Sequence, residues 1–204
     1  MKFKVNPEKV AVLVIDMTNA FVEPGAPLEV PKAREIVPAL KRVLASCRGL
    51  GIPILYVIHA FREDGLDAGL MFDFYPVLKS GCLNYGSSGT QVYAEISPEA
   101  NDITVYKNRY SAFFNTDLDL ILRRLGKDTI IVTGEASEFC CESTVRDAFY
   151  RDYKVLFLSD ANASSSEQLH AATMKTISNG FGEVLSSEDL LGRLAVASPQ
   201  KIAD

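Results

Sequence analysis

The sequence predicts an α/β fold in which helices cover both faces of a parallel sheet of about six strands. Two observations predict it. Short, near-continuous runs of β-branched and leucine residues recur along the chain, as they do in strands that are buried on both faces. Longer segments of helical periodicity separate these runs, and this alternation implies right-handed crossovers and a parallel sheet. We therefore expect a Rossmann-like three-layer sandwich.

The apolar runs are the expected strands. In chain order they are residues 10–16, 53–59, 102–107, 128–134, 154–160 and 182–186. The runs at 102–107 and 182–186 are the weaker ones.

The expected helices are residues 33–50, 116–125, 138–153 and 166–178. In the first of them, Ile36, Leu40 and Val43 fall on one face at steps of three and four residues. Residues 60–100 lack such a pattern, and irregular stretches of this length are usually functional. We expect a partly helical insertion there that covers the functional face or contacts another subunit.

The composition is that of a single globular domain spanning residues 1–204. Apolar residues make up 48% of the chain and charged residues 23%, which are ordinary values for a globular protein. The 21 Lys and Arg against 26 Asp and Glu give a formal net charge of −5. No basic stripe is therefore expected that could bind nucleic acid or an anionic membrane.

The expected location is the cytoplasm. No apolar stretch approaches the roughly 20 residues of a membrane span. The first apolar run is short and is interrupted at Asp16, so it does not resemble a signal peptide. Cytoplasmic thiols stay reduced, and a free cysteine is more often a small buried apolar residue than a reactive group. The four cysteines are Cys47, Cys82, Cys140 and Cys141.

Ligands of an open parallel sheet bind at the carboxyl ends of its strands. The residues that this rule nominates are Asp16, His59, Lys107, Thr133, Gly134 and Asp160, with Cys140 just beyond the fourth strand. Buried aspartate is rare unless it is paired or functional, and the alternative for Asp16 is to cap the following turn.

Cys140 is expected in the first turn of a helix that begins near residue 137 or 138. The free N–H groups and the dipole at a helix start lower the pKa of a thiol and can bind an oxyanion. Cys141 lies about 100° further round, so the two thiols cannot face one site. Inert packing of both thiols is the alternative.

Asp16, Lys107 and Cys140 can converge on one crevice from three strand ends. An acid that accepts a thiol proton, a cation that favours thiolate and a thiol at a helix start form a set that activates a nucleophile. The spacing alone leaves open whether these three residues meet by chance.

Three segments of the chain form a family pattern. They are VLVIDMTNAFVEPG with Asp16, KNRYSAFFNTDLDLILR with Lys107, and VTGEASEFCCESTVRDAFYRDYKVLFLSDA with Cys140. In this order they resemble the isochorismatase-like cysteine hydrolase superfamily, and its N-carbamoylsarcosine amidohydrolase and ureidoacrylate hydrolase branch in particular. The resemblance covers about residues 8–185, nearly the whole chain.

The resemblance implies roles for these residues. Asp16 would be the general base, Lys107 would support the charge of the thiolate and the oxyanion, and Cys140 would attack a carbonyl carbon. An amine or ammonia would leave, and water would hydrolyse the thioester. The resemblance also implies a cis peptide bond between Glu135 and Ala136, and an oxyanion hole formed by the N–H groups of Ala136 and Cys140.

The sequence departs from the family pattern at several positions. Thr18 and Ala20 stand where many members have Gln and Asp, and Glu135 replaces a residue that is usually small or apolar. We interpret Glu135 as solvated; the alternative is that it binds a cationic or amide-donor group. His59 has no second His nearby, so the nicotinamidase metal site is missing. We therefore expect no metal or cofactor, and interpret His59 and His170 as structural.

The expected function is a cysteine amidohydrolase that cleaves a C–N bond of a small amide, carbamoyl or ureido substrate. Phe21 and Tyr110 are the best candidates for substrate contact, since they follow Asp16 and Lys107 closely. The alternatives are an isochorismatase-type vinyl-ether hydrolase, and a catalytically silent or thiol-redox member that uses the Cys140–Cys141 pair. The resemblance also suggests a homo-oligomer, a dimer or tetramer, with residues 60–100 at its interface.

Overall fold

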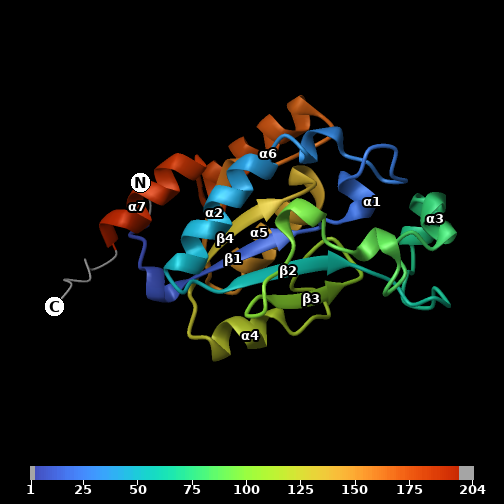
Figure 1. The fold of residues 1–204 in the computed structure, drawn as a ribbon, viewed down its shortest axis with the longest axis horizontal. Coiled ribbons are helices and arrows are strands. Elements are labelled where there is room, and N and C mark those ends of the chain that lie inside the picture. The colour runs from blue at the N-terminus through green and yellow to red at the C-terminus, as the bar shows by residue number, and fades with distance from the viewer. Residues whose placement is uncertain (1–2, 198–204) are drawn as a thin grey trace.

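The computed structural model describes residues 3–197, which form the three-layer α/β fold that the sequence predicts (Figure 1). All strand pairs of its six-stranded sheet are parallel, in the order β3-β2-β1-β4-β5-β6. The strands are β1 (Val10–Ile15), β2 (Ile54–His59), β3 (Ile103–Lys107), β4 (Thr129–Gly134), β5 (Lys154–Asn162) and β6 (Glu183–Leu185). The expected strands are thus confirmed, with small shifts of their ends.

The helices differ more from the expectation. They are α1 (Asn19–Val22), α2 (Val37–Gly49), α3 (Met71–Phe74), α4 (Leu118–Arg124), α5 (Glu142–Phe149), α6 (Glu167–Gly180) and α7 (Ser187–Ala197). Helix α2 begins later than expected because a separate 3₁₀ turn, Pro31–Ala33, precedes it. Helix α7 was not predicted, although its buried Leu190 and Leu194 are one helical turn apart.

The two faces of the sheet are packed by different helices, because successive side chains of a strand point to opposite faces. In β1, Val10, Val12 and Val14 share a cluster with residues of α2 and α7. The alternate residues Ala11, Leu13 and Ile15 share a cluster with residues of α4 and α5. Every residue of β1 is buried, as its unbroken apolar sequence indicates.

Asp160 does not end its strand, and this nomination from the sequence is wrong. Strand β5 continues to Asn162, and the carboxylate of Asp160 accepts hydrogen bonds from the N–H and the hydroxyl of Ser187, at 2.7 and 2.6 Å. Ser187 is the first residue of α7. Asp160 therefore caps the start of α7, because its carboxylate accepts a hydrogen bond from a backbone N–H that has no partner within the helix.

Most of residues 60–91 lie beyond the carboxyl ends of the strands, around the short helix α3, and the chain then returns past α2 to the start of β3 (Figure 1). Residues 60–100 contain 3₁₀ turns at Pro76–Ser80, Ser88–Thr90 and Ala94–Ile96. Phe61, Leu78 and Leu83 form a small buried cluster with two alanines. The segment is thus partly helical, as expected. It also exposes Leu66, Leu70 and Phe74, and a contact with another subunit there stays a prediction.

The strand order reverses between β1 and β4, and the ends of these strands bracket the crevice where such sheets bind ligands. Gly134 ends β4 with φ +115°, and a Cβ at this position would collide with the carbonyl oxygen of Ile15. Glycine therefore allows the chain to turn sharply against the end of β1. Among residues 3–197, no helix is both long and apolar enough to cross a membrane.

Candidate active site

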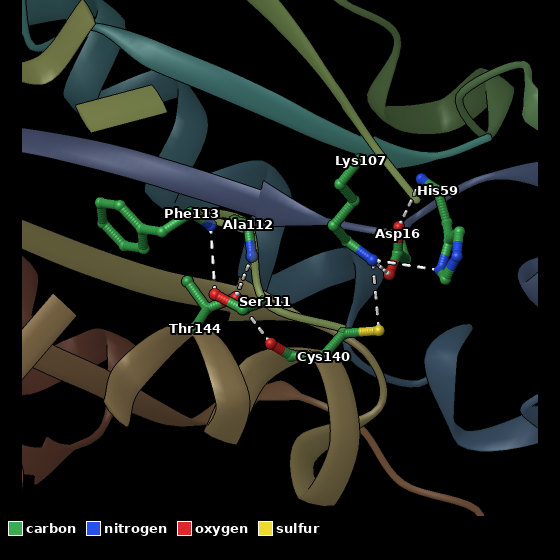
Figure 2. A network of polar contacts seen from close by, with 8 residues as sticks. All are labelled: Asp16, His59, Lys107, Ser111, Ala112, Phe113, Cys140 and Thr144. Carbon is green, nitrogen blue, oxygen red and sulfur yellow. Dashed lines mark hydrogen bonds and ion pairs between the residues drawn. The ribbon is translucent and has the colours of Figure 1, made fainter. Parts of the chain in front are cut away.

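Asp16 leaves β1 with a left-handed backbone, φ +54°, which few residues other than glycine adopt. Its side chain is fully buried. One carboxylate oxygen accepts the backbone N–H of His59 at 2.8 Å, and the other accepts the ammonium of Lys107 at 2.6 Å. The first contact fixes the carboxylate to the end of β2, and the second fixes it to the end of β3 (Figure 2).

Lys107 ends β3, and its Nζ lies at the centre of a buried polar cluster (Figure 2). Besides Asp16, it donates to Sγ of Cys140 at 3.3 Å and lies 3.3 Å from Nδ1 of His59. Burial by itself lowers the pKa of the ammonium, but the charge of Asp16 and the hydrogen bonds to Asp16 and Cys140 outweigh it and raise the pKa. Lys107 therefore stays charged in the buried site.

Cys140 lies in a π-helical turn, Ser137–Cys141, that leads into α5. Its carbonyl accepts the hydroxyl of Thr144 at 2.7 Å, and that hydroxyl in turn accepts the N–H of Ala112 at 2.9 Å. These two hydrogen bonds join the segment that follows Lys107 to the turn that carries the thiol (Figure 2).

The expectation of a lowered thiol pKa is wrong. Burial, and then the negative charge of Asp16, raise the pKa of Cys140 well above its ordinary value, and Lys107 opposes this only in part. The thiol is therefore protonated at neutral pH and needs a base. The Asp16 carboxylate is the base at hand, since ligand atoms of Asp16, His59 and Cys140 lie within 4.8 Å of one another.

His59 lies in the site, and its interpretation as a purely structural residue is too narrow. Burial and the charge of Lys107 lower its pKa well below the ordinary value, so the ring is neutral. An ammonium only donates hydrogen bonds, so the Nδ1 that faces Lys107 is the acceptor and Nε2 carries the hydrogen. In the part of the chain that the structure describes, Nε2 is buried and has no hydrogen-bond partner, and the ring lines the cavity, so Nε2 can donate to a ligand.

His170, in contrast, is placed as expected. Its ring contacts the hydroxyl of Ser137 at 2.7 Å and the carbonyl of Ser159 at 3.2 Å, and so connects the turn before Cys140 to β5.

The donor set of Asp16, His59 and Cys140 could hold a metal ion, but the ammonium of Lys107 lies within 3.3 Å of all three side chains. The chain thus supplies its own cation there.

A cavity of about 170 Å³ opens above Cys140. Its apolar walls come from the α1 region and from residues 60–100, so that segment covers the functional face as expected. The lining residues are Phe21, Leu28, Val30, His59, Met71, Tyr75, Leu78, Leu83, Tyr110, Glu135, Ala136, Glu138, Phe139, Cys140 and Ser165. Both candidate contact residues, Phe21 and Tyr110, are among them.

The peptide bond between Glu135 and Ala136 is cis, as expected. The carbonyl of Ala136 accepts the N–H groups of Phe139 and Cys141 at 3.1 and 3.2 Å, which closes the turn around Cys140. The role of Ala136 and Cys140 as an oxyanion hole stays a prediction.

Glu135 is buried, with 2% of its surface exposed, so the interpretation of a solvated side chain is wrong. It follows Gly134 directly, and its N–H donates to the carbonyl of Ile15 at 3.0 Å. Burial, and then the charge of Asp16, raise the pKa of Glu135 well above its ordinary value of 4.5. A neutral acid next to Asp16 adds no further negative charge to the site.

Relative to wild type, Glu135→Gln should therefore become increasingly stabilising as the pH rises from about 4.5 toward the raised pKa of Glu135 in the folded protein. The folded wild-type protein holds a proton on Glu135 that the unfolded chain releases above pH 4.5, so its stability falls as the pH rises through this window. The glutamine variant lacks this loss, and the difference in unfolding free energy should grow by up to about 1.4 kcal/mol per pH unit. Urea unfolding at several pH values measures it.

The exposed Glu63 offers a matched control for this change. Glu63→Gln should differ from wild type by the same small amount at every pH. A difference for Glu135→Gln that is equally flat would show that Glu135 is ionised in the folded protein.

Sequence reasoning missed Glu138, which stands two residues before Cys140. Both of its carboxyl oxygens are buried and have no hydrogen-bond partner within residues 3–197, and the residue lines the cavity. The only signal in the sequence was its place in the same turn as the thiol. Thr144 was missed as well, because its two hydrogen bonds join segments that are far apart in the sequence.

Comparison with known proteins gives a consistent set of matches. The sequence model of the isochorismatase domain matches residues 10–189. A curated relative, the ureidoacrylate amidohydrolase RutB of Caulobacter segnis, is 30% identical over 215 residues, which cover 96% of this chain and 90% of the relative. The RutB of Agrobacterium fabrum is 29% identical, with 95% and 93% covered.

Two solved structures show how far the similarity extends in space. A cysteine hydrolase from Pseudomonas syringae pv. phaseolicola has a TM-score of 0.94 at 36% identity, with 97% of both chains covered. The N-carbamoylsarcosine amidase of Thermoplasma acidophilum has a TM-score of 0.76 at 29% identity, with 88% of this chain and 97% of that chain covered.

Proposed function

The chain belongs to the isochorismatase family, and on that basis we propose that it is a cysteine amidohydrolase that works through a thioester. Its substrate is a small amide, carbamoyl or ureido compound. One observation carries the proposal: a single buried ammonium, that of Lys107, contacts both the carboxylate of Asp16 and the thiol of Cys140, beneath an apolar cavity.

Hydrolysis of non-peptide C–N bonds is the reaction class of this chain. The names of its relatives support this class, since both a ureidoacrylate amidohydrolase and an N-carbamoylsarcosine amidase cleave such bonds. The choice of substrate and the covalent route are the finer parts of the proposal.

In the first half of the reaction, the Sγ of Cys140 attacks the carbonyl carbon and its proton passes to the carboxylate of Asp16. A protonated thiol is a weak nucleophile, so this transfer has to accompany the attack. The N–H groups of Ala136 and Cys140 bind the oxyanion of the tetrahedral intermediate. The C–N bond then breaks, and Asp16 returns the proton to the leaving nitrogen.

In the second half, water attacks the thioester carbon while Asp16 accepts a proton from it. The second tetrahedral intermediate collapses, the C–S bond breaks, and the proton returns to the sulfur of Cys140. Lys107 keeps its charge in both halves and stabilises the negative charge as it moves between Asp16 and Cys140. Asp16 and Cys140 end in their starting protonation states, so the cycle balances.

The other two functions fit the residues less well. A redox pair would not need the contacts that Asp16 and Lys107 make with Cys140. Cys141 lies in the core, fully buried, and burial raises the pKa of its thiol well above the ordinary value. A vinyl-ether hydrolase would have no use for a thiol that is held next to a base.

The experiment is a screen for ammonia release over carbamoyl amino acids, ureido acids, alkylureas, biuret and simple amides. We expect at least one class to be hydrolysed, and rapid acid quenching followed by mass spectrometry to find the acyl group on the peptide that contains Cys140. Hydrolysis that continues at an undiminished rate in Cys140→Ser, with no adduct in the wild-type protein, would refute the covalent route.

A further inference from the structure

Glu138 is the feature of the cavity that the proposed reaction leaves unexplained. Both of its carboxyl oxygens are buried and lack a hydrogen-bond partner among the described residues. Buried polar groups are nearly always paired, because a buried donor or acceptor without a partner carries its full desolvation cost. A carboxyl group that lines a cavity two residues from the nucleophile is therefore poised for a partner that the ligand brings.

Within residues 3–197, the wall of this cavity offers Glu138 no cationic side chain to pair with. None of the residues that line the cavity is Lys or Arg. Lys107 lies below the lining and already contacts Asp16, and the ring of His59 is neutral. Arg109 acts on His59 through its charge, but it donates to the carbonyls of Asp67 and Asn108 and does not line the cavity.

The second acid of the cavity wall, Glu135, points to the same conclusion. It is buried at 2% exposure beside Asp16, and it is held neutral there. A ligand carboxylate would bring a further unpaired charge into a space that already disfavours one, and burying an unpaired charge is costly. An ammonium or a group rich in N–H would give Glu138 its missing partner, and a charge-assisted hydrogen bond is among the stronger ones.

We propose that Glu138 is a specificity-determining residue that selects substrates with a cationic or N–H-rich end and rejects those that carry a carboxylate. This inference rests on the proposed function, since it assigns the substrate class of the same site. The apolar walls at Leu28, Val30 and Leu83 accept a short alkyl stem between that end and the scissile bond. The substrate is thus a small aminoalkyl urea or amide, in contrast to the carboxylic acid that the name ureidoacrylate denotes.

Three ureas that differ only in their end group test this directly. They are 2-aminoethylurea, propylurea and 3-ureidopropionate, whose ends are cationic, neutral and anionic. We expect kcat/KM for ammonia release to fall in that order, with about 10- to 100-fold between the cation and the anion, the range of one hydrogen bond to a charged group. Equal rates, or a preference for 3-ureidopropionate, would overturn the inference.

Glu138→Gln should bring the three rates together, because the amide keeps the shape of the side chain and removes its charge. Glu63→Gln removes the same formal charge from an exposed position outside the cavity wall and should keep the wild-type order. A wild-type order that survives in Glu138→Gln would show that another group selects the charge.

Alkylation of Cys140 separates the inference from the proposed function, because it needs no turnover. Iodoacetamide and iodoacetate have nearly the same shape, and only the second is an anion. We expect the rate ratio of amide to acetate at Cys140 to exceed the ratio at the partly exposed Cys82 by about tenfold or more, and to approach it in Glu138→Gln. Equal ratios at the two thiols would refute charge selection even in an active enzyme. A high ratio without hydrolysis of any compound in the ammonia-release screen would refute the proposed function alone.

Discussion

Cys140→Ala should lower kcat for ammonia release by about 10⁴-fold or more and leave the fold intact. Removing the nucleophile of a covalent enzyme has effects of this size, because the residual rate comes only from binding and from the oxyanion hole. The alanine loses a sulfur at the edge of a cavity, and the hydrogen bond from Thr144 goes to the backbone carbonyl of Cys140, so it survives. Steady-state kinetics and thermal unfolding of the same preparation measure both effects.

Two other cysteines provide controls for this prediction. Cys82→Ala should keep wild-type kcat, since Cys82 does not line the cavity. Cys141→Ala should keep catalysis and lose stability, because the Cys141 side chain is fully buried in the core on the side of α5. If Cys141→Ala abolished turnover as completely as Cys140→Ala, the pair would be acting together and the redox alternative would gain support.

Asp16, Lys107 and Cys140 could each be nominated from local sequence, whereas their meeting at one site was implied by the family resemblance. An apolar run that stops at a charged residue marks a strand end, and parallel strands bring their ends to one edge of the sheet. The ionisation of these groups could not be predicted in the same way. The pKa of Cys140 depends on how completely residues 60–100 and the α1 region cover the thiol, which is a property of long-range packing.

The surroundings of three acidic residues also could not be predicted from the sequence. These residues are Glu135, Glu138 and Asp160. Acidic residues are usually solvated, so the burial of Glu135 and of the carboxyl oxygens of Glu138 was not expected from composition or periodicity. Glu135 is buried because Gly134 turns the chain inward against Ile15, and Glu138 lies in the π-helical turn that follows Ala136. Asp160 lies apart from the site because β5 is longer than its apolar run and the start of α7 needs a cap.

Lys107→Met should destabilise the protein by about 3–5 kcal/mol, in addition to abolishing activity. Both side chains of the ion pair between Lys107 and Asp16 are fully buried. Removing one partner leaves the other charge in the interior without compensation, and this costs far more than the intact pair contributes to stability. Urea unfolding at neutral pH measures the loss, and alkylation of Cys140 reports on the thiol in the same variant.

The double variant Asp16→Asn/Lys107→Met should recover most of that stability and none of the activity. It removes both charges, and the asparagine oxygen can still accept the N–H of His59 that now binds the carboxylate at 2.8 Å. If the ion pair instead stabilised the folded protein, the double variant would be at least as unstable as Lys107→Met alone. Recovered stability without turnover would therefore mean that the buried pair serves the chemistry of Cys140, with the fold bearing its desolvation cost.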